Sequence, residues 1–224
     1  MRTAVIVPVK ALGQVKSRLA PLLSLAERRH LAEIMLQGVL KAVGLLHPDI
    51  RKLVVTSYPL AMAMAEQLGM ECLRETSQVS ESHSVDTASA KLEAGGIEAV
   101  LRVPLDLPLV SAQALREVLA RAEAGAAAVL VPSLDGTGTN AVYRRPPTLF
   151  PSRFGPGSLA LHEQSLWRLG VPYTILELPA LALDLDDAAD VEALLERAED
   201  CPAAAYLREI GATGRLAEVR KAGA

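Results

Sequence analysis

The sequence predicts an α/β protein built on a parallel sheet, and three observations support this. Short apolar runs rich in β-branched residues alternate with longer segments of helical periodicity along most of the chain. The first run, residues 4–9, is apolar throughout and typical of a strand buried on both faces. Half of the 224 residues are hydrophobic, which is ample for a core. We therefore expect a single domain over residues 1–224, without internal repeats or linker-like stretches.

Three cations follow this first strand. Lys10, Lys16 and Arg18 surround Gly13 on a loop that leads into a short helical turn. The carboxyl end of a parallel strand is where open α/β sheets bind phosphates. A solvated basic loop is the alternative, but the position on the sheet favours an anion site.

Alternating helices and strands follow along the chain. Ser24 and Glu27 have the spacing of a capping box, which predicts the start of a long helix that ends before Pro48. The remaining pattern predicts strand 53–57, helix 59–68, strand 70–73, loop 74–83, helix 84–94, strand 99–103, helix 111–123, strand 127–132, helix 158–169, strand 174–178 and a helical tail over 203–224.

An aspartate follows the strand at residues 99–103. Asp106 lies between Pro104 and Pro108, which restrict the backbone around it. Such a residue is often a turn or cap residue. Because Asp106 lies at the same sheet edge as the basic loop, a role as a metal ligand is an equally good interpretation.

Two glycine-rich segments come next. Residues 135–143, DGTGTNAVY, place two glycines and two threonines in a turn before a strand. Repeated glycines allow successive N–H groups to converge on an anion, although an ordinary hairpin turn is the alternative. Residues 154–158, FGPGS, open a helix with Ser158 as the expected N-cap, which is a second candidate anion site.

A pair of aspartates lies late in the chain. Residues 181–185 continue the apolar, extended character of the preceding strand, so Asp184 and Asp186 point to the same side. Two carboxylates at this spacing suit a hard cation such as Mg²⁺. Helix capping is the alternative, but Asp187 with Asp190 serves it better and leaves the first pair free.

Charge and composition exclude several classes of partner. The chain carries 23 basic and 26 acidic residues, a net charge of −3, whereas nucleic-acid and anionic-membrane binders show a concentrated basic excess. Neither the four histidines nor Cys72 and Cys201 have metal-site spacing. The apolar start is too short for a signal peptide, and no apolar run reaches membrane-spanning length. We therefore expect a cytosolic protein without nucleic acid or membrane partners.

Five segments carry a resemblance to a known family. They are residues 7–36, which contain K-x5-K-S-R-L, residues 106–110 (DLPLV), 135–142 (DGTGTNAV), 153–162 (RFGPGSLALH) and 181–191 (LALDLDDAADV). Together they resemble the 2-phospho-L-lactate guanylyltransferase family, which includes the enzymes that use phosphoenolpyruvate in making coenzyme F-420. The resemblance spans nearly the whole chain.

This resemblance implies a single-domain nucleotidyltransferase (Rossmann-like) fold, with a mixed, mainly parallel sheet flanked by helices. It also implies transfer of the guanylyl group of GTP to a small phosphorylated three-carbon acid, with release of pyrophosphate. The site residues implied are Lys10, Lys16 and Arg18 for the triphosphate, Asp106, Asp184 and Asp186 for Mg²⁺, and Thr139, Gly155 and Ser158 for the phospho-acid. A phosphate monoester is an anionic nucleophile at pH 7, so no general base is needed.

Several alternatives stay open at this point. Ser84-Val85-Asp86 stands where many relatives have Gly-Leu-Asn, so base preference is less firmly implied than reaction type. Leu105 also stands where a small residue commonly precedes the aspartate. A molybdopterin guanylyl- or cytidylyltransferase and a non-catalytic nucleotide-binding regulator are the alternatives, and a homo-oligomer also stays open. We favour phosphoenolpyruvate over 2-phospho-L-lactate as acceptor, because a tight loop containing Pro156 suits the flatter molecule.

Overall fold

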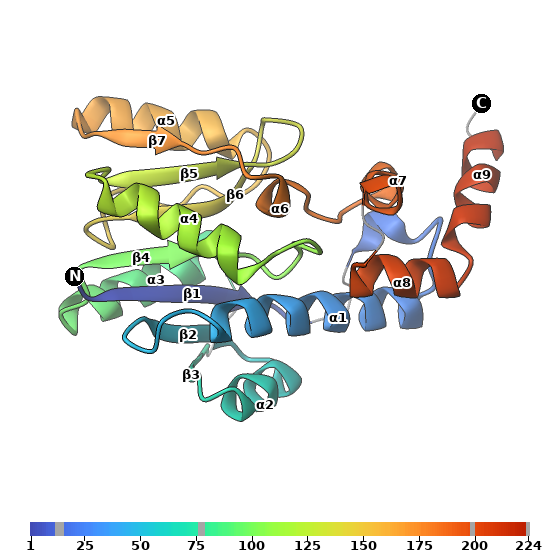
Figure 1. The fold of residues 1–224 in the computed structure, drawn as a ribbon, viewed down its shortest axis with the longest axis horizontal. Coiled ribbons are helices and arrows are strands. Elements are labelled where there is room, and N and C mark those ends of the chain that lie inside the picture. The colour runs from blue at the N-terminus through green and yellow to red at the C-terminus, as the bar shows by residue number, and fades with distance from the viewer. Residues whose placement is uncertain (12–15, 76–78, 198–199, 223–224) are drawn as a thin grey trace.

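The computed structural model describes residues 1–11, 16–75, 79–197 and 200–222, which form a sheet between two layers of helices (Figure 1). The strands are β1 (Thr3–Val9), β2 (Arg51–Thr56), β3 (Glu71–Arg74), β4 (Ala99–Arg102), β5 (Ala128–Pro132), β6 (Thr139–Arg144) and β7 (Tyr173–Ile175). The helices are η2 (Ser17–Leu19), α1 (Leu25–Gly44), α2 (Pro59–Gln67), α3 (Glu81–Ala94), α4 (Ala112–Glu123), α5 (Ser158–Leu169), α6 (Pro179–Ala182), α7 (Ala188–Arg197), α8 (Pro202–Glu209) and α9 (Ala212–Ala222).

The strands form one mixed sheet in the order β3-β2-β1-β4-β6-β5-β7. Strands β1 to β4 are parallel to one another, β7 is parallel to β5, and β6 is antiparallel to both of its neighbours. The predicted mixed, mainly parallel sheet is therefore confirmed. This topology brings the carboxyl ends of β1, β4 and β5 and the start of β6 to the same edge.

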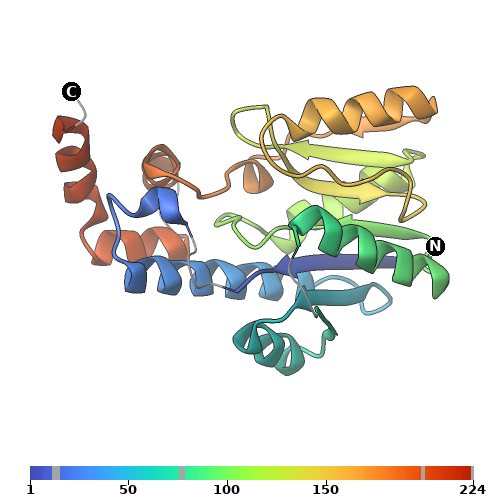
Figure 2. The same cartoon turned by 180° about the vertical axis from the view of Figure 1, so that it is seen from behind.

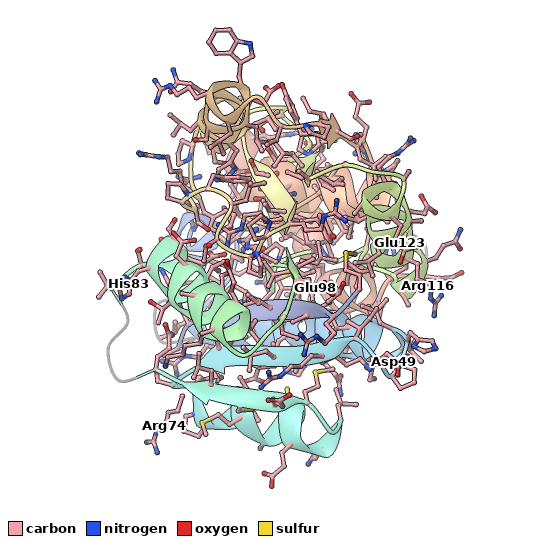
Figure 3. All side chains as sticks on the ribbon, turned by 90° about the vertical axis from the view of Figure 1, so that its left-hand side faces the viewer. Asp49, Arg74, His83, Glu98, Arg116 and Glu123 are labelled. Carbon is pink, nitrogen blue, oxygen red and sulfur yellow. The ribbon has the colours of Figure 1, made fainter. Side chains whose placement is uncertain are left out.

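Helices cover both faces of the sheet. Helices α1 and α4 lie on one face and α3 and α5 on the other, as comparison of Figures 1 and 2 shows. Figure 3 views the molecule from the end opposite α9 and shows His83 of α3 and Arg116 and Glu123 of α4 on opposite sides of the sheet. The alternating side chains of β1 explain this: Val5 and Val7 pack toward α1, whereas Ala4 and Ile6 pack toward α3.

The C-terminal helices α7, α8 and α9 extend the molecule beyond the carboxyl ends of the strands (Figure 1). They share a hydrophobic cluster with the first turns of α1, in which Leu31 and Met35 meet Leu194 and Leu207. The predicted capping box begins α1: the Glu27 N–H donates to Ser24 Oγ at 3.3 Å, and the Ser24 N–H donates to Glu27 Oε2 at 2.8 Å.

Three local predictions were wrong. Helix α3 begins at Glu81 rather than at residue 84, because Ser80 caps it by accepting from the His83 N–H at 3.1 Å. Residues 181–185 are not extended throughout: Pro179 begins the short helix α6, which includes residues 181 and 182, and the extended conformation starts at Leu183. The N-cap of α5 is Gly157, with a φ of 71°, and Ser158 is the first helical residue.

None of the helices in the described ranges is both long and apolar enough to span a membrane.

Candidate active site

A cavity of about 450 Å³ opens at the sheet edge where β4 and β5 end and β6 begins. Its wall combines carboxylates, hydroxyl groups and glycines from segments far apart in the sequence. Seven of the nine residues implied by the resemblance line it: Arg18, Asp106, Thr139, Gly155, Ser158, Asp184 and Asp186. A second cavity of about 210 Å³ adjoins it and is lined by the other two, Lys10 and Lys16.

Hydrogen bonds that link the loop after β4, the start of β6 and the segment after α6 bring the three aspartates together. The Leu185 N–H donates to the Asp106 carbonyl at 3.2 Å, which ties the late segment to the end of β4. The Asn140 amide on β6 donates to the carbonyl of Ala182 at 2.8 Å and to Asp184 Oδ1 at 3.2 Å. Asp106, Asp184 and Asp186 consequently line the same cavity. For Asp184 and Asp186, the spacing had predicted side chains on the same side of the chain.

Lys16 occupies the space between two of these carboxylates. Its Nζ lies 2.8 Å from Asp106 Oδ2 and 2.6 Å from Asp186 Oδ1, and its side chain is only 6% exposed. Burial alone would lower the pKa of Lys16, but the two carboxylates outweigh it and raise that pKa above its usual value. The Asp106 carboxyl is partly buried, which alone would raise its pKa, but the pairing with Lys16 keeps that pKa below its usual value. Both groups are therefore charged at neutral pH.

No cation among the described residues forms such an ion pair with Asp184. Burial, together with the negative charges of Asp106 and Asp186, raises its pKa to about 6. The carboxylates at this wall thus carry more negative charge than Lys16 offsets. A divalent cation would relieve this repulsion, and carboxylate oxygens are the ligands that Mg²⁺ prefers.

The donor chemistry therefore fits Mg²⁺, although no group of three acidic, histidine or cysteine side chains in the described ranges already forms a metal cage. Mg²⁺ keeps several waters and commonly binds one or two carboxylates together with substrate phosphates, so a complete protein cage is not required.

A cluster of hydroxyl groups forms another part of the cavity wall. Ser158 Oγ lies 3.2 Å from Thr139 Oγ1, and both side chains are at most 5% exposed. His162, one turn further along α5, completes the cluster: the Arg153 N–H donates to its Nε2 at 3.0 Å, so its Nδ1 carries the proton and donates to Thr139 Oγ1 at 3.1 Å. One hydroxyl proton of the Thr139–Ser158 pair is then left to donate into the cavity.

The loop between β5 and β6 does not form the predicted anion nest. Asp135 accepts hydrogen bonds from the Thr137 N–H at 2.9 Å and from Ser133 Oγ at 2.6 Å, and these bonds lower its pKa to about 2. The Gly138 N–H donates to Ser133 Oγ at 2.7 Å. The N–H groups that the glycine pattern offered to an anion are used within the loop, which instead fixes the start of β6.

Sequence reasoning missed two charged residues of the cavity wall. Arg102, at the end of β4, is 5% exposed, pairs with Glu81 of α3 and lies over the ring of Phe154, with 4.0 Å between Cζ and the ring centroid. No local motif marks either residue, since a charged side chain at the end of an apolar strand is more often solvated. Burial of Arg102 depends on the long-range approach of α3 and of the loop before α5.

The segment Ser84-Val85-Asp86 holds the loop before α5. The Asp86 carboxylate accepts from the Ser152 N–H at 2.9 Å, from Ser152 Oγ at 2.6 Å and from Arg144 Nη1 at 3.1 Å. Ser84 Oγ donates to the Ser80 carbonyl at 2.9 Å. In this chain, therefore, the carboxylate at position 86 positions residues 150–154 beside the cavity.

The fold and the cavity together define a nucleotidyltransferase-like protein: its sheet edge presents cations, carboxylates and hydroxyl groups to one pocket. A solved structure described as a nucleotide-diphospho-sugar transferase of Desulfovibrio desulfuricans G20 matches 97% of this chain and 97% of its own, with a TM-score of 0.78 at 16% identity. The chain belongs to the guanylyl transferase CofC-like family, whose model matches residues 3–222.

Two relatives agree with this family. The phosphoenolpyruvate guanylyltransferase of Rubrobacter xylanophilus is 36% identical over 197 residues, covering 87% of this chain and 94% of the relative. The 2-phospho-L-lactate guanylyltransferase of Methanothermobacter thermautotrophicus is 29% identical over 210 residues, covering 94% and 92%. The predicted guanylyltransferase family and nucleotidyltransferase fold are confirmed, and the molybdopterin-type alternative is set aside.

Proposed function

We propose that this guanylyltransferase joins GTP to phosphoenolpyruvate and releases pyrophosphate, as a step of coenzyme F-420 biosynthesis. The observation that carries the proposal is the wall of carboxylates shared by two adjoining cavities. Asp106 and Asp186 line both, with Lys10 on the side of the smaller cavity and Thr139 and Ser158 on the side of the larger one. Two anionic substrates bound on either side would meet at this wall.

Each group of residues then has a separate task. Lys10 and Lys16, which line the smaller cavity, hold the triphosphate of GTP together with Arg18, which reaches the shared wall from the larger cavity. These cations lower the cost of the charge that develops on the departing pyrophosphate. Thr139 and Ser158 donate a hydroxyl proton to the acceptor, while the conformations of Gly155 and Gly157, with φ of 126° and 71°, shape the loop around it.

In the reaction, a phosphate oxygen of the acceptor attacks the α-phosphorus of GTP in line with the bond to the leaving pyrophosphate. One P–O bond forms as another breaks, and the acceptor phosphate needs no general base because it is already ionised at pH 7. Asp106, Asp184 and Asp186 would hold Mg²⁺, which supplies charge neutralisation between the two substrates when it is bound.

Pyrophosphate release over a matrix of four nucleotides and three phospho-acids tests the proposal. We expect GTP with phosphoenolpyruvate to be fastest and a chelator to abolish release. If 2-phospho-L-lactate or 3-phosphoglycerate is clearly faster, the acceptor assignment is wrong and the reaction class stands. If no combination releases pyrophosphate, the chain has lost catalysis and acts as a nucleotide-binding regulator.

A further inference from the structure

We propose that Arg102 binds the carboxylate of the acceptor and that Glu81 holds this position until the acceptor displaces it. The inference rests on the proposed function, since it assigns one group of the phospho-acid to one side chain. It concerns the larger cavity, whose wall includes both residues.

The guanidinium group of Arg102 is fixed in place. Its Nη1 donates to the carbonyls of Thr139 and Asn140, at 3.3 and 2.9 Å, and its flat face lies 4.0 Å from the centroid of the Phe154 ring. An arginine whose plane and one nitrogen are held in this way is preorganised to bind a ligand along its remaining edge.

Only one of the two nitrogens on the remaining edge of Arg102 has a hydrogen-bond partner. The Nε–H and one Nη2–H of an arginine point the same way and together match the two oxygens of a carboxylate. In Arg102 the Nη2 contacts Glu81 Oε1, whereas the buried Nε has no hydrogen-bond partner in the described part of the chain. A buried donor without a partner is costly, so a ligand that binds both nitrogens would gain a contact that Glu81 does not supply.

The ion pair between Arg51 and Glu71 shows the same edge fully used in this protein. There Nε donates to Oε1 at 2.6 Å and Nη2 donates to Oε2 at 2.7 Å. Glu81 makes a single contact of this kind with Arg102, and its side chain is 30% exposed at the first residue of α3. It can therefore turn toward solvent when another carboxylate arrives.

The charge of the cavity favours the same assignment. Among the described residues that line it, Arg18 and Arg102 are the cations, against seven acidic side chains: Glu81, Asp106, Asp135, Asp184, Asp186, Asp187 and Asp190. The acceptor phosphate must lie at the shared carboxylate wall, because its oxygen attacks GTP there. The acceptor carboxylate then needs a cation on the other side, and Arg102 lies next to Thr139, which binds the same molecule.

The first test compares two competitors that differ by one carboxylate. 2-Phospho-L-lactate and ethyl phosphate are assayed as inhibitors of the wild-type enzyme against phosphoenolpyruvate. We expect 2-phospho-L-lactate to bind at least about 30-fold more tightly, and this ratio to fall to within about 3-fold in Arg102→Gln. A wild-type ratio near one overturns the proposal without any variant.

The second test separates Arg102 from Glu81. In Arg102→Gln, KM for the acceptor should rise about 10- to 100-fold while KM for GTP changes less than about 2-fold. In Glu81→Gln, which removes the competing carboxylate, the acceptor KM should fall. A rise of the acceptor KM in Glu81→Gln, or an equal rise of both KM values in Arg102→Gln, contradicts the proposal.

Arg51→Gln is the matched control, because it makes the same change in an arginine–glutamate pair that lines neither cavity. Its KM values should equal those of the wild type. If circular dichroism shows that Arg102→Gln does not fold, two measurements still test the proposal: the wild-type affinity ratio of the two inhibitors and the acceptor KM of Glu81→Gln. Absence of wild-type turnover with every phospho-acid would instead refute the proposed function.

Discussion

Lys16 lies where the two proposed substrates meet, and its two ion pairs predict how its removal changes stability and the response to Mg²⁺. In Lys16→Met, Asp106 and Asp186 lose their shared cation, so the free energy of unfolding without metal should fall by about 1–3 kcal/mol. Mg²⁺ should then stabilise the variant more than the wild type, since it replaces the lost charge. Thermal unfolding with and without Mg²⁺ measures this difference.

Lys41→Met, which removes a cation from the last turn of α1, is the control. An equal effect of Mg²⁺ on the unfolding temperatures of wild type and Lys16→Met would contradict the assignment of the carboxylates to a cation. Turnover should also fall in Lys16→Met, by the equivalent of about 1.5–3 kcal/mol in barrier or binding, because one charge-assisted contact with the triphosphate is lost.

His162 gives the molecule a pH-dependent stability. Burial, helped by the charges of Arg144 and Arg102, lowers its pKa to about 4, whereas an unfolded histidine titrates near 6.5. Between these values the unfolded chain binds the proton and the folded chain does not, so stability falls as the pH drops from 6.5 toward 4. The loss approaches about 3 kcal/mol.

Denaturant titrations at pH 7, 5.5 and 4.5 measure this loss, and His162→Gln should remove most of the slope. If the stability of His162→Gln depends on pH as that of the wild type does, a group other than His162 is responsible for the pH dependence. Because Nδ1 of His162 sets the hydroxyl protons of Thr139 and Ser158, the variant should also raise KM for the acceptor more than KM for GTP.

For single residues, the sequence predicted which functional side chains lie at the same sheet edge, but not which partners each side chain contacts there. Lys10 and Asp106 were predicted to share a sheet edge because each follows an apolar strand, and the structure places them there. The pairing of Lys16 with two carboxylates and the burial of Arg102 depend on segments more than twenty residues away. Neither spacing nor composition carries that information.

Among the elements, α1 connects the sheet to the C-terminal helices, and Glu27 near its start links α1 to α9. Its carboxylate accepts from the Ser24 N–H and from both terminal nitrogens of Arg215 on α9, each of these at 2.9 Å. The Arg215 and Ser24 hydrogen bonds lower the pKa of Glu27 to about 2. This stabilisation is present above the unfolded pKa near 4.5 and is lost as the pH falls through about 2.

We expect Glu27→Gln to lower the free energy of unfolding by about 1–2 kcal/mol at pH 7, and by little at pH 2. Urea titration at the two pH values checks this, with Glu33→Gln, on the same helix, as control. A loss of the same size at both pH values would mean that the charge of Glu27 is not responsible.

A predicted element boundary was wrong where the expected capping residue finds its hydrogen-bond partner in a distant part of the chain. The Ser158 hydroxyl contacts Thr139 of β6 instead of capping its own helix, and Gly157, in the left-handed conformation, takes the N-cap position. The capping box at Ser24 and the end of α5 at Leu169 were predicted correctly, because both depend on residues within one turn.

For the whole molecule, the packing of α1 predicts a single unfolding transition. Its residues Val39 and Val43 lie in the core beneath the sheet, whereas Leu31 and Met35 lie in the cluster with α7 and α8. The C-terminal helices therefore lose their packing surface when the sheet unfolds, and the chain should behave as one domain. Calorimetry and far-ultraviolet circular dichroism should give coincident transitions, and two separated transitions would refute this.

The central claim is that guanylyl transfer takes place at the carboxylate wall between the two cavities. Its most direct test is a mass-resolved assay of wild type and Asp184→Asn with GTP, phosphoenolpyruvate and Mg²⁺, with Asp49→Asn, outside both cavities, as control. The account predicts one guanylylated product and one pyrophosphate per turnover in wild type and control, and a loss of at least about 100-fold in folded Asp184→Asn. Product formation by Asp184→Asn at the wild-type rate would contradict it.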